Sequence, residues 1–450
     1  MAYTITEFGT LKTRLAELLG DNAKVFWTEA ELGTYLHEAL TVFQALAHYW
    51  RETGSYTPTP GQRWQALSSV VRNPGGDYLL QSQVTDRELL EQVLYTLLED
   101  LPVTWASWGL TEQFNQAEIE AAFHRAVAAF QAEANTRLVR TLIPLSPIVG
   151  TYELNERVVG IQSLAVITPE GNRYPLWKEP RRTYQLHRQS FLPEEVGFPR
   201  SYTWLGDNAE LLRLHPLPAD TGTLEALSVE LTPPSTPTSS ATALTLPPNL
   251  WWVIKYGVLA DLLSRDGEGQ DWARAEYCRQ RWEDGIQLAK LEMPSVTRVW
   301  LNTLEIEITS LQALESWRPA WGNETGTPRQ LILAGWEIAA FYPAIASTDT
   351  EPYTAEMQLV QRINLPASDS EIVTIGEEYL TAILAYARHI ALLKTSGAEF
   401  QQSLPAYQEL FDAAANYNDR LRKHQRAFSF YHAQATKDRN AELLTKPQEQ

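Results

Sequence analysis

The chain has 450 residues, and 37 Lys and Arg against 55 Asp and Glu give it a formal net charge of −18. Hydrophobic residues make up 44% and charged residues 20% of the chain, which is typical of globular proteins and excludes a disordered one. Because no run approaches eighteen apolar residues and the N-terminus lacks a basic-then-apolar pattern, we expect neither a transmembrane helix nor a secretory signal. The acidic balance argues against a protein that coats nucleic acid by neutralising phosphates.

Two segments near the N-terminus, residues 27–45 and 114–132, match each other at an offset of 87 without a gap. Each starts with an aromatic residue and a capping box, Thr28 with Glu31 in the first and Asn115 with Glu118 in the second. The spacing predicts a duplicated amphipathic helix whose apolar side chains face a core. The predicted apolar stripes are Leu32, Leu36, Ala39 and Phe43 in the first copy and Ile119, Phe123, Ala126 and Phe130 in the second.

The rest of the chain shows a second internal repeat, which we interpret as a β-rich segment followed by a helical pair, present twice. Residues 161–167 resemble 301–307 at an offset of 140, and this offset places Trp177 on Trp317. The offset then shortens to about 130. Later matches pair Pro199-Arg200 with Pro328-Arg329, Gly206 with Gly335, His215-Pro216 with Tyr342-Pro343, and Tyr256 and Tyr277 with Tyr386 and Tyr407.

The predicted fold class is α+β, with helical bundle units and small antiparallel β domains, internally duplicated. Strands are expected over 157–167, 211–214, 223–231, 297–308, 338–342 and 357–363, and helices over 250–263, 272–291 and 375–393, with Tyr407 inside the last long helix. The predicted domains are an N-terminal helical domain (1–147) with the duplicated helix, a first β-rich unit (148–231), a Pro/Ser/Thr-rich linker loop (232–248), a first helical pair (249–293), a second β-rich unit (294–368), a second helical pair (369–433) and a polar tail (434–450).

Sequence motifs for catalysis or cofactor binding are absent. The chain has no G-x-x-x-x-G-K-[ST], G-x-G-x-x-G, H-E-x-x-H, paired C-x-x-C or G-x-S-x-G motif. Asp266, Glu268 and Asp271 fall near each other but miss the spacing of a calcium loop, so we interpret them as a turn and a helix N-cap. We therefore expect no catalytic residue, no cofactor and no metal site.

Several residues remain candidates for packing or for contacts with a partner. His37 and His124 occupy equivalent helix positions beside the apolar stripes, and we interpret them as packing or interface histidines and not as metal ligands. Cys278, the single cysteine, is expected to be a buried structural thiol. Arg200 and Arg329 share a Pro-Arg turn before a strand, where each either pairs with a carboxylate of a neighbouring element or lies on the surface.

Tryptophans and adjacent carboxylates are compatible with two other functions. Trp251, Trp252 and residues 317–321 could stack sugars, although the match of Trp177 with Trp317 favours a structural anchor. Glu99-Asp100 and Glu194-Glu195 could serve as acid/base pairs, although adjacent carboxylates in polar loops are usually solvated. The alternatives are thus a receptor- or carbohydrate-binding virion protein and a carboxylate-based hydrolase.

The order of these elements resembles that of tailed-phage head-to-tail adaptor proteins. Residues 21–40 contain an aromatic-Thr-x-x-Glu-Leu cap and a Leu-x-x-Ala-Leu helix like those that open adaptor proteins. Residues 211–225 are similar to the paired strands of these proteins, and residues 247–277 resemble their closing helical pair. The resemblance covers residues 5–290, with a degenerate second copy beyond, whereas family members typically hold one copy of each unit.

The resemblance implies a structural virion protein that forms an adaptor or connector ring in the neck or tail. It implies a homo-oligomer of 6 or 12 copies that contacts the portal and the tail or neck proteins. Double-stranded DNA would pass without sequence-specific binding, and no membrane would be involved. Assembly would take place in the host cytoplasm. Because the units are duplicated, six chains would present twelve quasi-equivalent units.

Overall fold

The computed structural model describes an α+β architecture, as the sequence predicts. Contacts divide the chain into two compact units, one made of Met1–Tyr49 with Ile363–Gln450 and the other of Trp50–Arg362. The described residues are 3–420 except 77, 81–83, 100, 102–104, 106–113, 181–194, 205–210, 236, 238–240, 268, 293–295, 337, 347–352, 361–362, 364–365 and 367. The polar tail and the match at Gly206 therefore lie outside the described residues.

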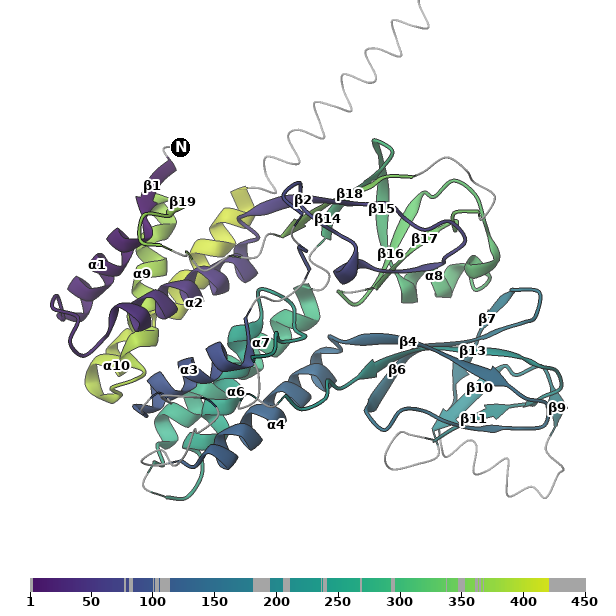
Figure 1. Ribbon diagram of the computed structural model, residues 1–450, viewed down its shortest axis with the longest axis horizontal. Helices are drawn as coiled ribbons and strands as arrows, with labels where there is room; N and C mark the ends of the chain where they lie inside the picture. Colours follow the sequence, from purple (N-terminus) through teal and green to yellow (C-terminus); the bar gives the residue numbers. More distant parts are fainter. Residues whose placement is uncertain are drawn as a thin grey trace, which may run out of the picture. The chain divides into compact units, whose positions relative to one another are not determined.

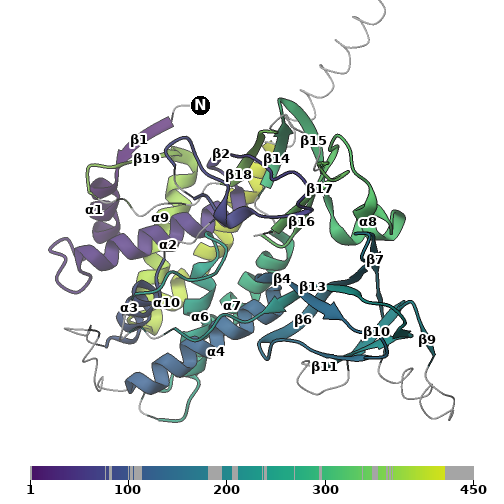
Figure 2. The same ribbon diagram turned by 45° about the vertical axis from the view of Figure 1, so that its right-hand side comes forward.

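The unit formed by the two ends of the chain is mainly helical. Its helix α2 packs on α9, and α1 contacts both of them, so that segments more than 300 residues apart lie side by side (Figures 1 and 2). A short antiparallel pair, β1 with β19, lies at the start of α1 and α9, and residues 406–420 are helical. The elements are β1 (Tyr3–Glu7), α1 (Phe8–Leu19), α2 (Glu29–Ala47), β19 (Ile372–Gly376), α9 (Glu377–Leu392) and α10 (Gly397–Ser403).

The second unit contains a bundle of four helices, in which α6 packs on α4, α7 and α3 (Figure 2). Helix α6 is apolar all round, and its Trp251 and Trp252 are almost fully buried. A helix of this kind requires neighbours on every side, which the other three helices supply. Their bounds are α3 (Asp86–Leu97), α4 (Gln116–Ala134), α6 (Trp251–Leu263) and α7 (Trp272–Glu292).

The predicted capping boxes are present in both helices of the predicted repeat. In α2 the Thr28 hydroxyl accepts from the Glu31 N–H, and the Glu31 carboxylate accepts from the Thr28 N–H at 2.8 Å. In α4 the same bonds join Asn115 and Glu118 at 2.9 and 3.0 Å. All eight residues of the predicted apolar stripes are buried. Local sequence therefore predicted where both helices begin and which face each one buries.

A seven-stranded sheet, here called the outer sheet, joins strands from both ends of the second unit. Its order is β2-β18-β14-β15-β16-β17-β3, and the purple strand β2 lies beside the green strand β18 in Figure 1. Its core includes Val299, Leu331, Phe341 and Met357. The strands are β2 (Arg51–Tyr56), β3 (Trp64–Ala66), β14 (Val296–Leu301), β15 (Leu304–Ser310), β16 (Gln330–Ala334), β17 (Ile338–Tyr342) and β18 (Ala355–Val360); α8 (Leu311–Trp317) and a 3₁₀ turn (Trp321–Asn323) follow β15.

Two four-stranded sheets, here called the inner sheets, are built from the stretch of chain between β3 and β14. Their orders are β4-β13-β6-β7 and β5-β11-β10-β8, and they share a core that includes Leu164, Tyr202, Leu214 and Leu224. A short parallel pair, β9 with β12, lies beside them. The strands are β4 (Leu138–Leu145), β5 (Thr151–Glu153), β6 (Val158–Ile167), β7 (Arg173–Pro175), β8 (Trp177–Lys178), β9 (Val196–Gly197), β10 (Ser201–Trp204), β11 (Leu211–His215), β12 (Leu217–Pro218) and β13 (Gly222–Glu230).

The inner sheets repeat the strand order of the outer sheet. Strands β7 and β8 are separated only by Leu176, and joining the inner sheets there gives β4-β13-β6-β7/β8-β10-β11-β5. Each neighbouring pair has the same direction as its counterpart, including the parallel pairs β8 with β10 and β15 with β16. The registers agree as well, because Arg51 pairs with Val360 and Leu138, which lies 87 residues after Arg51, pairs with Val229.

The observed strands correct one predicted match. The expected strand 297–308 is a hairpin, with β14 and β15 joined at Asn302 and Thr303, which both have positive φ. By strand partners, Trp177 in β8 corresponds to Glu307 in β15, and Trp317 instead ends helix α8. The offset of 140 is therefore wrong for these strands, because it aligns the hairpin turn between β14 and β15 with the middle of β6.

The compact units also differ from the consecutive segments expected from the sequence. Residues 1–147 contain β1, β2, β3 and β4 besides their helices, and contacts place residues 1–49 and 50–147 in different units. The partners of these strands lie far along the chain, with β2 paired to β18 and β4 to β13. Such pairing leaves no mark in a local window of sequence, so the strands before residue 148 were not predicted.

The Asn115 cap provides a direct test of helix α4. We expect Asn115→Ala to lower the free energy of unfolding by about 1 kcal/mol, because the N–H of Glu118 loses its side-chain acceptor at the helix start. Gln116→Ala is the matched control, since that side chain donates to Glu120 one turn further on. Urea denaturation followed by circular dichroism measures both. Equal midpoints for the two variants would contradict the role of the cap.

Candidate interaction surfaces

A buried cluster of charges joins the inner and outer sheets of the second unit. The Arg173 guanidinium on β7 contacts the Glu225 carboxylate on β13 at 2.8 Å and the Glu315 carboxylate on α8 at 2.9 Å. The side chains of Arg173 and Glu225 are 1% and 0% exposed. Charges so deeply buried are costly unless they are paired and hydrogen-bonded. Here the pairing links an inner strand pair to the helix that follows β15.

Further hydrogen bonds complete this cluster, which we call the Arg173 joint. Arg173 Nη2 donates to Ser163 Oγ at 2.9 Å, and Arg140 Nη2 lies 2.7 Å from the second oxygen of Glu225. The Asn323 side chain bonds both the N–H and the carbonyl of Arg173. The guanidinium also lies over the Trp321 ring, 5.3 Å from its centre. Each nitrogen of the Arg173 guanidinium thus has a specific partner.

An apolar cluster lies beside the joint and contains residues of both the inner and outer sheets. Trp64 and Trp321 of the outer part meet edge to face, with ring centroids 5.7 Å apart. Inner residues Leu138, Leu227 and Val229 pack into the same cluster. Because this burial is continuous from one sheet to the other, we infer that the two sheets hold together as part of one fold.

The electrostatics of the joint favour the charged form of Glu225. Burial alone would raise the pKa of this carboxyl, but the charges of Arg173 and Arg140 and their hydrogen bonds outweigh burial and hold the pKa below its ordinary value. Removing Arg173 would leave a buried carboxylate with Arg140 as its remaining ionic partner.

The two repeat histidines have equivalent backbone partners. His37 on α2 is buried, and its Nε2 lies 3.1 Å from the carbonyl oxygen of Ile363. His124 on α4 is half-buried, and its Nε2 lies 2.9 Å from the carbonyl oxygen of Ser235. Each carbonyl lies in the segment that follows a strand, β18 in the case of Ile363 and β13 in the case of Ser235. This confirms their interpretation as packing histidines, which fasten a connection to a helix.

Burial also changes the acidity of one of these histidines. Desolvation lowers the pKa of His37 to about 4, although its hydrogen bond to Ile363 opposes this shift. The ring is therefore neutral at pH 7, and its Nε2–H donates to the carbonyl.

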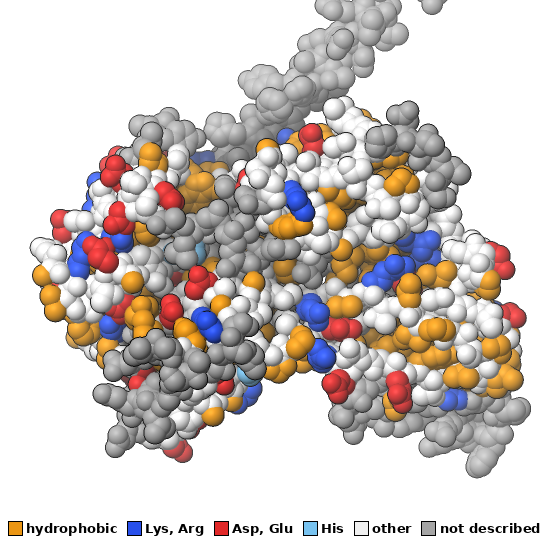
Figure 3. Space-filling model, in the orientation of Figure 1, with side chains coloured by type: hydrophobic (Ala, Val, Ile, Leu, Met, Phe, Trp, Pro, Cys, Tyr) orange, Lys and Arg blue, Asp and Glu red, His pale blue; other side chains and the backbone are white. Residues whose placement is uncertain are grey.

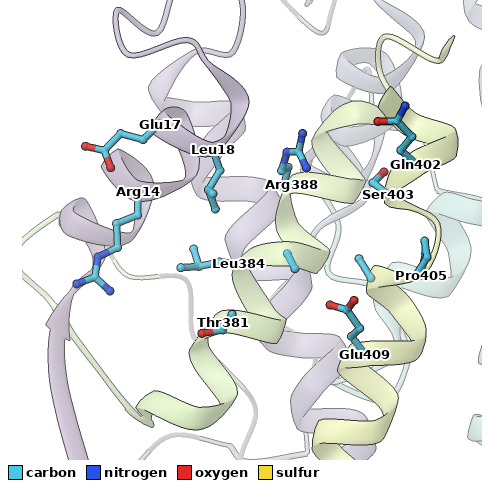
Figure 4. Close-up of a pocket in the computed structure, with 12 residues that line it drawn as sticks. Arg14, Glu17, Leu18, Thr381, Leu384, Arg388, Gln402, Ser403, Pro405 and Glu409 are labelled. Carbon is cyan, nitrogen blue, oxygen red and sulfur yellow. The ribbon is translucent and has the colours of Figure 1, made fainter. Parts of the chain in front are cut away.

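A groove of about 730 Å³ lies on the helical unit, between α1, α9 and the helical residues after α10 (Figure 4). Leu18 of α1 and Leu384 of α9 form part of its apolar wall. Its charged residues are balanced in sign. They are Arg14, Glu17, Arg388 and Glu409.

Exposed apolar side chains gather on the inner sheets, where Figure 3 shows orange surface over the region of β13, β10 and β9. Tyr174 and Phe198 meet edge to face there, with centroids 5.0 Å apart. Contiguous apolar surface of this kind typically marks a site of protein contact. The exposed large apolar residues of the inner strands and their loops are Leu142, Ile148, Val149, Val159, Tyr174, Trp177, Val196 and Phe198.

The predicted tryptophan anchors are not buried. Trp177 and Trp317 are 65% and 53% exposed, because each lies at the end of a short element and not in a core. Trp251, Trp252 and Trp321 are the buried ones of those singled out from the sequence. The exposed tryptophans of the described residues do not form a row along one β face, as a sugar platform would require.

Other predicted residues have local structural roles. Asp271 caps α7 by accepting from the Arg274 N–H at 3.1 Å, as expected, and Cys278 is buried. Arg200 and Arg329 are both exposed, and their N–H groups donate to the equivalent carbonyls of His215 and Tyr342. Their shared turn thus serves the backbone pairing of β10 with β11 and of β16 with β17.

Each proposed carboxylate pair has one member outside the described residues, so only Glu99 and Glu195 have a described position. Glu99 is buried, contrary to the expectation of a solvated pair, and Glu195 is exposed. Glu268, Asp100 and Glu194 lie outside the described residues. Within the described part of the chain, no three His, Cys, Asp or Glu side chains converge in a way that could hold a metal ion. None of the described helices is both long and apolar enough to span a bilayer.

Local sequence patterns did not predict the Arg173 joint. Arg173 sits in a polar turn-like stretch, Gly-Asn-Arg-Tyr, and Glu225 in an apolar strand, and neither position suggests a buried pair. The available signal was Glu225 itself, a charge flanked by Leu224, Ala226 and Leu227 in the middle of a strand. Its partners, Arg173 and Arg140, lie 52 and 85 positions away, which local patterns do not reveal.

Loss of Arg173 should destabilise the second unit strongly. We expect Arg173→Met to lower the free energy of unfolding by about 3–5 kcal/mol, because Glu225 and Glu315 stay buried or half-buried with a partner removed. Arg318→Met is the control, since Arg318 pairs with Glu324 on the surface and its loss should change stability by at most about 1 kcal/mol. Urea denaturation measures both. Adding Glu225→Met to Arg173→Met should restore part of the loss, and equal effects of Arg173→Met and Arg318→Met would refute the assignment.

The pKa of His37 predicts a pH dependence of stability. The pKa of His37 is about 4 in the folded chain and ordinarily 6.5, so the unfolded chain takes up the proton at a higher pH than the folded chain does. The free energy of unfolding should therefore fall as the pH drops from 6.5 to 4. The difference corresponds to about 3 kcal/mol. His37→Gln should remove this dependence, whereas His124→Gln at the equivalent, half-buried position should retain it. Thermal melts between pH 4 and 7 check this; identical profiles for the wild type and His37→Gln would contradict it.

Comparison with known families adds a finding that agrees with this geometry. No curated protein matches the chain. Residues 87–299 match the SU10 adaptor protein family. This range is a little under half of the chain, starts within α3 and ends within β14, and so contains the inner sheets and their four helices. Over these residues the chain is therefore similar to phage structural adaptor proteins, which form virion components.

Proposed function

We propose that this protein is a structural virion component that forms an adaptor or connector ring in the neck or tail of a tailed phage. It joins the portal and head to the tail and encloses part of the channel through which DNA passes. The observation that carries the proposal is the family match over 87–299, which spans one complete set of helices and strands. Its role is mechanical, without a catalytic residue, cofactor or metal.

The repeated strand order supports two adaptor modules in one chain. We define the inner module as residues 85–292 and the outer module as residues 1–73 with 296–420. The outer sheet has the strand order of the inner sheets, and α2 and α4 share their capping boxes and histidine contacts. In this proposal the inner module is inserted between β3 and β14 of the outer one.

The duplication gives a reason for a ring of six chains. Six chains carry twelve modules, which suits a position between a twelvefold portal and a sixfold tail. The net charge of −18 suits a channel wall that repels the phosphates of passing DNA and so avoids adhesive contacts. The portal and the tail or neck proteins are the expected partners, and assembly takes place in the host cytoplasm.

The symmetry of the assembled protein tests this function. We expect native mass spectrometry and electron microscopy of the purified full chain to reveal closed rings of six chains with a central channel. The physical reason is that a contact between two different faces of one chain repeats from copy to copy. It closes into a ring when the rotation from one copy to the next adds up to a full turn. Rings of twelve chains would refute the twelve-module arrangement. A protein that stays monomeric at all concentrations, and that is absent from purified virions, would refute the structural role.

A further inference from the structure

A short segment completes the core of the outer sheet. It consists of residues 70–72 and 78–80 and is here called the outer plug. The plug runs along the free edge of β2, where Ser55 and Arg72 exchange backbone hydrogen bonds of 2.8 and 3.2 Å. The fit is close, because a Cβ at Gly54 of β2 would lie 2.7 Å from side chains of the plug. The plug residues that are buried in the core of the outer sheet are Val71, Leu79 and Leu80.

The inner sheets have no counterpart of the outer plug. Strand β5 takes the place of β3, and only the turn 154–157 separates it from β6. Strand β4 is the last strand of its sheet, and among the described residues no segment pairs with its outer edge. By register, Leu142 of β4 takes the place of Ser55, and its side chain is 50% exposed. Thr141 takes the place of Gly54 and is half-buried.

The core of the inner sheets is incompletely covered along this edge. Four apolar residues that pack against it are only half-buried. By strand register, each corresponds to an outer residue that is at most 7% exposed and shares a core with the plug. The corresponding pairs are Ile143 and Tyr56, Leu154 and Leu67, Ile161 and Val296, and Trp204 and Leu333. We call the four inner residues of these pairs, together with Leu142, the open flank.

The polar tail of the chain contains one large apolar feature, the adjacent Leu443 and Leu444. In a strand, neighbouring side chains point to opposite faces. Strand β4 presents Ile143 on its core face and Leu142 on the opposite face. An extended Leu443-Leu444 pair beside β4 therefore covers apolar side chains on both faces of this edge.

The tail is long enough to reach another copy of the chain. It follows Arg420, which pairs with Glu378 at the start of α9 at 3.3 Å. From there an extended chain reaches Leu443 over a span of up to about 80 Å. A compact globule of 450 residues has a radius of gyration of only about 22 Å. The tail also holds 6 Lys and Arg against 3 Asp and Glu, so the net charge of −18 on each chain attracts it.

We propose that Leu443 and Leu444 of one chain bind the open flank of a neighbouring copy, and that their segment adds a strand to the outer edge of β4. The tail does between chains what the outer plug does within a chain. It pairs with the edge of the sheet and supplies the apolar side chains that the inner core lacks. The inference rests on the proposed ring and names a contact that links successive chains in it.

Acidic substitutions in the tail test this contact in the full chain. Leu443→Asp/Leu444→Asp should raise the concentration at which rings dissociate at least tenfold, because burial of one leucine is already worth about a factor of ten. Gln448→Asp/Gln450→Asp is the matched control, since it adds the same charge at polar positions of the tail, and it should leave assembly unchanged. Native mass spectrometry measures both. Equal ring stability of the two variants would refute the role of the leucines.

A photocrosslinker at the open flank identifies what binds there. Leu142 is replaced by p-benzoylphenylalanine, and rings are assembled from a mixture of isotopically light and heavy chains. The expected crosslinks join two different chains and map to residues 440–450. The same replacement at Leu304, which is exposed in the hairpin of the outer sheet, is the control and should give no crosslink to those residues.

The outcomes separate this inference from the function on which it rests. Rings whose crosslinks from position 142 stay within one chain, or map outside residues 440–450, would overturn the contact and leave the ring intact. A wild-type chain that never assembles would overturn the proposed function as well.

Discussion

The arrangement of the second unit depends on one desolvated ionic cluster. Arg173 brings a full positive charge into the interior, and two glutamates, one on strand β13 and one on helix α8, compensate it. An ionic cluster of this kind accepts few alternative geometries, because each nitrogen must meet its acceptor. Apolar contact alone would tolerate sliding of one sheet over the other. The cluster therefore supplies orientation, and the apolar residues beside it supply most of the burial.

The same elements serve different purposes in the two copies of the strand order. Strand β13 is covered on both faces from Leu224 onward, with Glu225 and Ser228 buried among its apolar residues, whereas β18 alternates between covered and open positions. The histidines on α2 and α4 make equivalent backbone contacts, yet His37 is buried, which lowers its pKa, whereas His124 is half-buried. Conserving the backbone while changing the surface chemistry lets one topology act as a core in one place and as a surface in another.

Sequence patterns predicted the parts of this fold that short-range chemistry determines. Helix starts followed from Thr28 and Asn115, and burial of the stripes followed from the 3.6-residue period. The pairing of β2 with β18 and the Arg173 joint could not be predicted, because their partners lie tens to hundreds of residues apart. Trp177 was misplaced for a related reason. The sequence match paired Trp177 with Trp317, whereas the strand partners pair Trp177 with Glu307.

The insertion of one set of strands between β3 and β14 has a consequence for synthesis on the ribosome. Strand β2 emerges about 300 residues before its partner β18, which at ~5–20 residues per second is a delay of roughly 15–60 s. The inner strands have all their partners within residues 138–230 and can pair long before that. The nascent chain therefore completes its middle first and holds an unpaired N-terminal strand until translation nears its end.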